Sequence, residues 1–568
     1  MNAQRLVARC TAWGLCLIAW AMAPPLSAAE QPLPLSARID QCIDQRLREL
    51  KITPAGPSSD AEFVRRVFLD LNGVIPTAEE ARSFIEDSSP DKRQRLIADL
   101  LARPDYAIHM ARVFDVMLAE RRVPTIKSYD VPAAEWRQYL AESFAENKPW
   151  DQLVRELLSS DGADTNPIAA VKFYLVRDVE PHQLTRDVGR LFLGFDLQCA
   201  QCHDDPRFDE YLQADYYGIY AFLQRSKLFP LTPRGAAVSE LAEGKTSFTS
   251  VFTAQSGETN PRLPGGEMLA DPAIDKGMEY AVRPAPKQRA IPAYSRRLKL
   301  AQELPRTPTH GFARNLANRL WALMFGRGLV HPLDLHHAGN PPSHPELLDR
   351  LETWVVEHDY DIKAVLHEMA LSQAYQRSSV HPDGGQQIPE NAFAVAMLRG
   401  LTAEQLRWSW LQATGRIQAH NARLEAAQQR TAETIESRPA WKTRLANSEA
   451  LERQSASLLE TFAGLPGSTD EVFQPTVDQA LYLRNSVKLL PLLKDEPGTL
   501  LAKLTEMDDA QAVADELYLA ILARRATPVE IDQVAELIAD KQAPAERREP
   551  LQALQWGLLL SAEFRLNH

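Results

Sequence analysis

The chain has 568 residues, of which 45% are hydrophobic and 24% charged, and its formal net charge is −12 at pH 7. This length and hydrophobic content can build a sizeable packed core. The acidic balance, without any dense Lys/Arg run, argues against nucleic acid or an anionic membrane as the main partner. Five cysteines provide no disulfide framework, so packing is expected to supply the stability.

The N-terminus carries the pattern of an export signal. A basic start is followed by an apolar stretch over residues 10–23 and by the small residues Ser27 and Ala29, which suit cleavage before Glu30. The apolar stretch is too short to span a membrane comfortably, and no later stretch approaches the required length. We therefore expect residues 1–29 to be a signal peptide. The mature chain is expected to lack a transmembrane segment and to be exported to the periplasm or cell surface.

Residues 30–224 predict an all-helical domain. Ser59 and Thr77 each precede a glutamate by three residues, which is the pattern of a helix-capping box. Pro90 follows Ser89 in the way that opens a helix. Further amphipathic helices are expected over residues 105–121, 133–146 and 149–159.

Within this domain, Cys199-Ala-Gln-Cys202-His203 is the strongest chemical signal. Two thiols three residues apart share one face of a helical turn and can reach the two vinyl groups at one porphyrin edge. The following imidazole can ligate the iron. This pattern predicts one covalently attached haem c, with Cys199 and Cys202 as thioether sites and His203 as an axial iron ligand.

Two other interpretations of the motif stay open. A structural zinc site usually needs four Cys or His ligands. The only further cysteine beyond residue 29 is Cys42, so zinc would have to recruit distant histidines. A dithiol redox motif of the thioredoxin type expects a strand–turn–helix context. Here the motif ends a helical pattern, and haem c is therefore the favoured interpretation.

The residues before the motif recur at helical spacing and predict one helix that delivers both thiols to an apolar pocket. They are Val188, Leu191, Phe192, Phe195, Cys199 and Cys202. An aromatic cluster at 215–222 either walls a porphyrin or forms ordinary core. The Nδ1–H of His203 is expected to bond a backbone carbonyl or a carboxylate. The side chains of Asp204, Asp205 and Asp209 either lower the redox potential or are ordinary solvated residues.

The sixth iron ligand would decide what such a site does. A Met or His makes an electron carrier, whereas an open position permits chemistry on a small molecule. Met110 and Met117 are candidates because their helix is expected near the haem, and His182 is a candidate because it shortly precedes the motif. Each of these residue types is more often a core or surface residue than an iron ligand. His344 is expected to cap a helix instead.

The remainder of the chain predicts a change of structure and then a return to helices. Residues 225–300 are richer in Pro, Gly, Ser and Thr, and 246–252 alternate like a strand. Residues 301–568 predict a second helical domain with a polar helical hairpin at about 402–460. The expected fold class is mainly α, with two helical domains joined by a small β-rich insertion. The pattern of residues 67–80 recurs at 517–530, which similar helix–turn–helix constraints explain without a repeat.

Five stretches of the chain together resemble a known family. They are RRVFLDLNGVIPTAEE, LFLGFDLQCAQCHDDPRFDEYLQADYYGIYAF, NRLWALMFGRGLV, NPPSHPELLDRL and ALQWGLLLSAEFRLNH. The family consists of secreted, haem-motif proteins abundant in planctomycetes and related bacteria, and it joins two domains of unknown function, the first described as cytochrome-like. The resemblance implies haem c on Cys199, Cys202 and His203 and no established reaction. The chain departs from the family by Asp205, where many members have a second histidine, and by lacking a Cys-rich segment near 473–476.

Three functions remain in competition. The first is an exported electron-transfer protein or the redox component of a periplasmic or cell-surface system. The second is a haem-dependent, peroxidase-like enzyme, for which a distal His–Arg pair would be needed and for which no spacing selects one. The third is a non-catalytic surface binding or scaffold protein with a structural haem. The sequence names neither a redox partner protein nor an oligomeric state.

Overall fold

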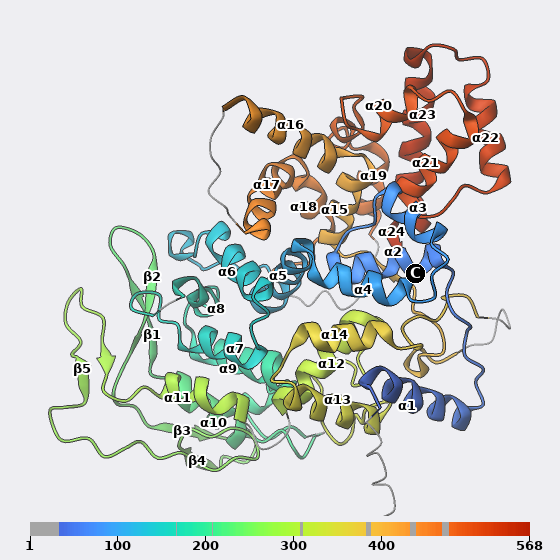
Figure 1. Ribbon diagram of the computed structural model, residues 1–568. Coiled ribbons are helices and arrows are strands. Elements are labelled where there is room, and N and C mark those ends of the chain that lie inside the picture. The colour runs from blue at the N-terminus through green and yellow to red at the C-terminus, as the bar shows by residue number, and fades with distance from the viewer. Residues whose placement is uncertain are drawn as a thin grey trace, which may run out of the picture.

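The computed structural model describes residues 33–165, 167–206, 208–306, 311–381, 388–431, 439–467 and 476–568. The expected signal peptide lies outside these residues. Within them the chain is mainly helical, as predicted, and its strands form small two-stranded antiparallel sheets (Figure 1). None of the described helices combines the length and the apolar character needed to cross a membrane.

The helices before residue 225 lead from the N-terminal end of the described chain to the Cys199–His203 motif. They are α1 (Leu35–Leu50), α2 (Asp60–Asn72), α3 (Ala78–Glu86), α4 (Lys92–Ala102), α5 (Pro104–Ala119), α6 (Ala133–Ala145), α7 (Trp150–Ser159), α8 (Lys172–Leu175), α9 (Pro181–Val188) and α10 (Gln213–Leu223).

Three antiparallel strand pairs follow, and they extend to one side of the helices (Figure 1). Their strands are β1 (Ser226–Pro230), β2 (Ala236–Glu240), β3 (Thr246–Thr249), β4 (Ser256–Thr259), β5 (Tyr280–Val282) and β6 (Ile291–Pro292). In the β3–β4 pair, Thr246 lies opposite Thr259 and Thr249 opposite Ser256. The strand alternation read from residues 246–252 is therefore confirmed for its first four residues.

Helices return after the strands. They are α11 (Arg296–Glu303), α12 (Gly311–Phe325), α13 (Pro345–Glu357), α14 (Ile362–Leu371), α15 (Ala403–Ala413), α16 (Arg416–Thr431), α17 (Ala440–Gln454), α18 (Ala456–Phe462), α19 (Val477–Asn485), α20 (Leu500–Thr505), α21 (Ala510–Leu522), α22 (Pro528–Ile538), α23 (Pro544–Leu560) and α24 (Ala562–Arg565). A short strand pair joins β7 (Arg399–Gly400) to β8 (Leu566–Asn567) at the end of the chain.

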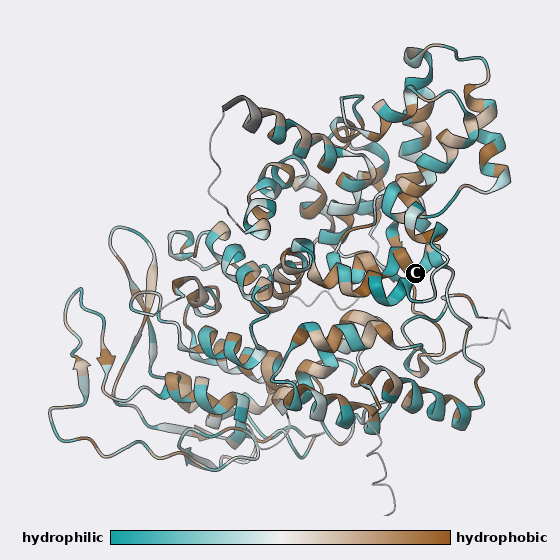
Figure 2. Ribbon diagram, in the orientation of Figure 1, coloured by the Kyte–Doolittle hydropathy of each residue, from teal (hydrophilic) through white to brown (hydrophobic). Residues whose placement is uncertain are grey.

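Apolar side chains gather in two cores, visible as brown helix faces turned inward in Figure 2. The larger core combines α1–α10 with α11–α14. The smaller core combines α15–α24 with residues from α2 and α3, including Leu69 and Ala81. Each core therefore draws on segments from distant parts of the chain.

The C-terminal segment is held in place by a buried arginine of α2. The Arg65 guanidinium is fully buried and donates hydrogen bonds to the carbonyls of Ile521, Phe564 and Leu566 at 3.2, 2.6 and 3.3 Å. The end of the chain consequently lies beside α2 (Figure 1). Arginine suits this role because its planar fork offers several donors in fixed directions.

The region 402–460, for which the composition predicts a polar helical hairpin, begins with a helix that belongs to the core. Its first helix, α15, is a core helix with Trp408, Trp410 and Leu411 buried. The more polar α17 packs along α5 and α6, where Arg444 pairs with Asp105 at 3.0 Å. The bulky apolar side chains of α15 can leave water only by packing against other helices. α15 therefore joins the core although the rest of the region is polar.

Candidate functional site

The Cys199–His203 motif lies on a short 3-10 turn and not on the predicted continuous helix. α9 ends at Val188, a π-helical segment spans Gly189–Leu193, and Gly194 then takes a left-handed conformation with φ 76°. A Cβ at Gly194 would lie 2.6 Å from the His336 ring, so only glycine fits there. The prediction of one helix from residue 188 to Cys202 is therefore wrong.

Both thiols of the motif are exposed, which corrects the expectation that they face an apolar pocket. The backbone N–H groups of Cys202 and His203 donate to the carbonyl of Cys199 at 3.2 and 3.4 Å. Residues i and i+3 of a 3-10 turn have eclipsed side chains. Cys199 and Cys202 thus leave the same side of the turn.

His203 presents an available ring nitrogen. Its Nδ1 lies 2.7 Å from the carbonyl oxygen of Asp204, and because a carbonyl can only accept, Nδ1 carries the proton. In the neutral imidazole, Nε2 is then the nitrogen with a free lone pair. The Asp204 side chain accepts the backbone N–H of Gln213 at 2.7 Å, so this carboxylate stabilises the N-terminus of α10.

α10 holds the turn through two residues one helical turn apart. The phenol of Tyr217 donates to the Gln201 carbonyl at 3.2 Å, and the amide of Gln213 reaches the same oxygen at 3.5 Å. From α9, Arg186 donates to the side chain of Gln201 at 3.0 Å. The middle of the motif is therefore fixed by polar contacts while its two thiols stay exposed.

The aromatic cluster of α10 is divided between the larger core and the surroundings of the motif. Tyr216 and Phe222 are fully buried in the larger core. Tyr217 and Tyr220 are half-buried and lie against His182 on α9, whose ring stacks on Tyr220 with centroids 4.5 Å apart. Only part of the cluster therefore belongs to the surroundings of the motif.

The three candidate sixth ligands lie in different places. His182 belongs to the surroundings of the motif, and its Nδ1 is 2.8 Å from the Tyr216 hydroxyl. Burial lowers the pKa of His182, which favours the neutral ring. Met110 is fully buried in the larger core, and Met117 lines a mainly apolar cavity with Leu191 and Leu320. No residue of the motif lines that cavity.

The loop after α12, at residues 335–336, packs against the chain on both sides of the motif. This contact was not predicted from the sequence. Phe195 and Leu335 form an antiparallel bridge, and His336 donates its backbone N–H to Gly194 at 3.1 Å. The Tyr211 phenol donates to the His336 carbonyl at 3.2 Å. The adjacent histidines His336 and His337 were the signal in the sequence that could have pointed to this loop. They lie far from the motif along the chain, so nothing in the sequence indicated the contact.

His344 does not perform the capping role expected of it. It occupies the position before α13, yet its side chain makes no capping hydrogen bond. Its Nδ1 lies 3.1 Å from the Ser343 hydroxyl, and the ring is buried near Phe393. The His344 ring is therefore buried by packing in the larger core and does not act as a helix cap.

Buried ion pairs hold the motif-bearing segment to α12. Asp187 on α9 contacts Arg177 at 2.6 Å, Arg122 at 2.7 Å and Arg190 at 3.0 Å. Arg190 also reaches Asp334, which pairs with Arg319 of α12. Burial alone would raise the pKa of Asp187, but the three arginines outweigh it and hold that pKa well below its usual range.

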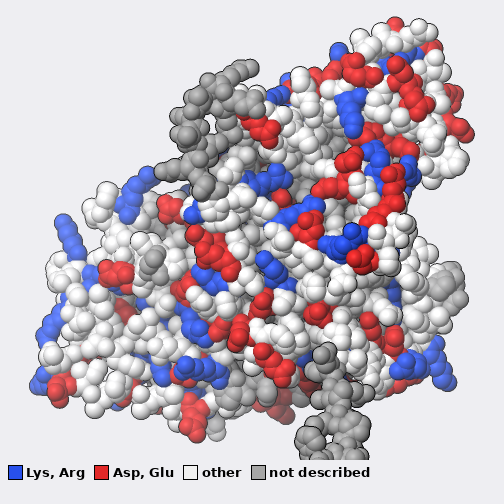
Figure 3. Space-filling model, viewed as in Figure 1, with Lys and Arg blue, Asp and Glu red and all other residues white. Residues whose placement is uncertain are grey.

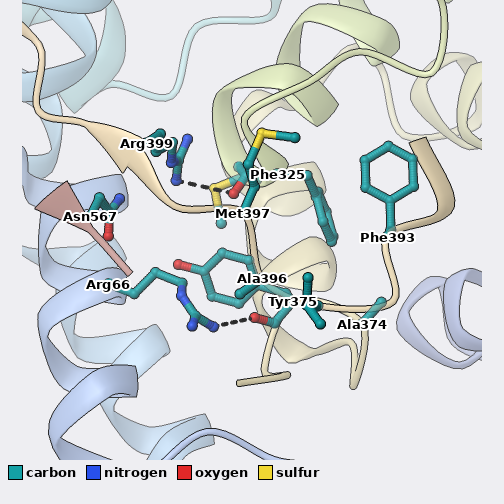
Figure 4. A pocket seen from close by; sticks show the side chains of 11 residues that line it. Arg66, Phe325, Ala374, Tyr375, Phe393, Ala396, Met397, Arg399 and Asn567 are labelled. Carbon is teal, nitrogen blue, oxygen red and sulfur yellow. Dashed lines mark hydrogen bonds between the residues drawn. The ribbon is translucent and has the colours of Figure 1, made fainter. Parts of the chain in front are cut away.

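A second polar cluster surrounds a pocket between α2, α12 and the C-terminal strand (Figure 4). Arg66 donates to the carbonyl of Tyr375 at 2.7 Å, and Arg399 donates to that of Met324 at 3.1 Å and pairs with buried Asp70. Both guanidinium groups are thus occupied by protein oxygens. This pocket is best explained as a junction that holds the chain end in place.

The charge distribution and the metal chemistry of the described residues are also informative. On the face shown in Figure 3, acidic and basic side chains are interspersed without a large basic patch.

Within the described ranges, no three or more His, Cys, Asp or Glu side chains gather so as to hold a metal ion. The zinc interpretation of the motif gains no support from this part of the chain.

Comparisons with known proteins identify two domains. Residues 38–227 match a family model described as a protein of unknown function (DUF1549), and residues 296–538 match a second with the same description (DUF1553). No curated protein and no solved structure matches the chain. The residues from 228 to 295, which include β2–β6, lie outside both matched ranges.

Proposed function

This chain belongs to the proteins that join a DUF1549 domain to a DUF1553 domain, and from that premise we propose that it is an exported c-type haem protein that transfers electrons or serves as the redox component of a periplasmic or cell-surface system. One observation carries the proposal. Two exposed thiols leave one side of a short turn, directly followed by a histidine whose Nε2 is available.

The residues present fit a haem. Each of the two thiols would add across one porphyrin vinyl group, with sulfur bonding the inner carbon and the thiol hydrogen moving to the outer carbon. His203 would offer Nε2 to the iron, while the Asp204 carbonyl, bonded to Nδ1–H, fixes the ring and raises its basicity. A bound haem would supply one-electron exchange between ferrous and ferric iron.

The surroundings of the turn support electron transfer. Cys199 and Cys202 are both exposed, so a porphyrin edge attached there would be accessible to a partner protein. Arg186, Gln213 and Tyr217 fix the turn from two helices, which keeps its geometry constant. A rigid and accessible site suits electron exchange because little reorganisation accompanies each transfer.

Covalent attachment is the decisive test. The full chain should be produced in a host with active cytochrome c maturation, denatured and weighed by mass spectrometry. We expect one porphyrin per chain, and we expect its loss from the Cys199→Ala/Cys202→Ala variant. Cys42→Ala is the matched control, because Cys42 is half-buried on α1, a helix that packs on α13 and α14, and it should retain the haem. A wild-type chain without porphyrin would refute the proposal.

Ligand-binding spectra then separate the kinds of haem protein. Slow or absent binding of carbon monoxide to the reduced form is expected of an electron carrier, because both axial positions are filled. Rapid binding would favour catalysis on a small molecule. Export is tested separately by sequencing the N-terminus of the mature protein, which we expect to begin at Glu30.

A further inference from the structure

The β3–β4 hairpin lies against the Cys199–His203 turn, although it is outside both matched domains. The backbone N–H of Val251, at the hairpin tip, donates to the carbonyl of Cys202 at 3.0 Å. The tip itself is closed by the N–H of Ser250, which donates to Gln255 at 2.9 Å. A direct backbone hydrogen bond thus joins two segments that are almost fifty residues apart in sequence.

α10 fixes the hairpin through the same two residues that hold the turn. The buried amide of Gln213 reaches the Thr249 carbonyl at 3.4 Å as well as the Gln201 carbonyl. The Tyr217 ring stacks on Phe248 of β3, with centroids 5.0 Å apart and planes 13° apart. The relative position of hairpin and turn is therefore set by three contacts of different kinds.

The hairpin tip exposes large apolar side chains beside the two thiols. Val251 is 66% exposed and Phe252 is 74% exposed. Single exposed apolar residues are common on protein surfaces. Val251 and Phe252 are not such isolated residues, because they are adjacent in sequence. The Phe252 ring also stacks on the His203 imidazole, with centroids 4.3 Å apart and planes 29° apart. An apolar surface is thus held next to the proposed thioether and iron-ligand atoms.

We propose that this hairpin tip, residues 250–255, forms one wall of the haem site and that Phe252 is a positioning residue for the His203 imidazole. This inference rests on the proposed function, because it names the residues that complete the same site. Stacking covers the face of the imidazole and leaves its in-plane Nε2 lone pair uncovered. Val251 and the outer edge of Phe252 supply the apolar contact that a porphyrin plane would bury.

The two ring contacts of His203 then have separate roles. The Asp204 carbonyl fixes which nitrogen is protonated, and Phe252 fixes the rotation of the ring about its bond to Cβ. An imidazole fixed in both respects keeps its lone pair in one direction. The insertion that lies outside both matched domains would in this way determine how tightly the iron is held and how far its surroundings exclude water.

Proteolysis of the full chain tests the wall without a substitution at Phe252. Chymotrypsin should cleave after Phe252 in the Cys199→Ala/Cys202→Ala protein, where the ring is 74% exposed. In the haem-loaded wild type we expect at least tenfold slower cleavage at that bond. Cleavage after Tyr280 on β5, in a different strand pair, is the internal control and should proceed at the same rate in both proteins. Equal rates at Phe252 would overturn the wall.

Substitution tests the positioning role. Phe252→Ala should keep the covalent porphyrin mass, bind carbon monoxide in the reduced form at least fivefold faster than wild type, and change the redox midpoint potential. Val529→Ala, at an apolar residue of α22 that is 66% exposed, is the control and should match wild type. Identical behaviour of both variants would overturn the role of Phe252. A wild type without porphyrin would overturn the proposed function and the wall together, whereas a loaded wild type with unprotected Phe252 would overturn the wall alone.

Discussion

The Tyr217 phenol donates a hydrogen bond to the carbonyl of Gln201 across 3.2 Å and so connects α10 to the middle of the Cys199–His203 turn. Burial raises the pKa of Tyr217, which keeps the phenol protonated as a donor at neutral pH. The same ring stacks on Phe248 of the β3–β4 hairpin. One side chain thus connects the helix, the motif and the insertion.

Removing only this hydroxyl should weaken the structure modestly. Tyr217→Phe keeps the stacking on Phe248 and loses one hydrogen bond, so we expect the free energy of unfolding to fall by about 0.5–1.5 kcal/mol. The control is Tyr220→Phe on the same helix, where we expect a change below about 0.5 kcal/mol. Chemical denaturation followed by circular dichroism measures both. An equal loss in the two variants would contradict a specific role of the Tyr217 hydrogen bond.

A methyl group at Gly73 should be poorly tolerated. Gly73 ends α2 with φ 69°, and a Cβ there would lie 2.1 Å from Nδ1 of buried His109. Gly73→Ala combines left-handed strain with overpacking, so we expect a loss of about 2–5 kcal/mol. Ala523 ends α21 with φ 59° and is buried.

Ala523→Gly is the matched control for Gly73→Ala. It relieves left-handed strain but removes a buried methyl group, and these opposing effects should leave stability within about 1 kcal/mol of wild type. Thermal and denaturant unfolding of both variants are the measurements. Similar losses at the two helix ends would show that the His109 contact does not matter.

The buried carboxylate of Asp187 should be necessary for stability. Asp187→Asn leaves the fully buried Arg177 guanidinium without its ionic partner, and breaking one side of such a pair costs about 3–5 kcal/mol. Asp99→Asn removes an exposed partner of Arg103 and should cost at most about 1 kcal/mol. Denaturant unfolding at pH 7 compares them, and a loss at Asp187 no larger than at Asp99 would refute the expectation.

Mild acid should destabilise the protein because of buried histidines. Burial lowers the pKa of His109 and His336 to about 3 and that of His344 to about 4. Unfolded histidines titrate near 6.5, so the unfolded chain takes up protons below that pH while the native rings stay neutral. The stability that the neutral rings provide is complete above about pH 6.5 and falls as the pH drops towards the native values.

The size of this effect is measurable between pH 7 and pH 5. Each of the three histidines should cost about 2 kcal/mol at pH 5 relative to pH 7. His336→Gln should remove about a third of that pH dependence, whatever it does to absolute stability through packing. Denaturant unfolding at several pH values gives the slope directly. Parallel pH profiles for wild type and His336→Gln would contradict the assignment.

Several helix starts were predicted correctly from the sequence, although α4 begins at Lys92 and not at Pro90. Ser59 accepts the N–H of Glu62 at 3.2 Å, and Thr77 forms the complete capping box with Glu80. The expected similarity between residues 67–80 and 517–530 also has a structural counterpart, since both contain a helix, a left-handed end and a capped second helix. These features depend on residues a few positions apart, which is the range over which sequence patterns are informative.

The contact between the two similar helix pairs was not predictable in the same way. Arg82 on α3 pairs with Glu516 on α21 at 2.7 Å, and α3 contributes Ala81 to the core around α21. The segments are more than four hundred residues apart. Their apolar faces indicate that each must be buried, but not against which partner.

By itself the sequence determined the mainly helical class, several helix starts, the strand at Thr246–Thr249 and the spacing of Cys199, Cys202 and His203. Only the tertiary structure decided that the motif lies on an exposed turn. It also decided that Phe252 stacks on the histidine of the motif and that α10 is hydrogen-bonded to the turn through Tyr217. The physical reason is one of range. Caps and periodicities arise from neighbouring residues, whereas these contacts arise when distant apolar and polar surfaces pack together.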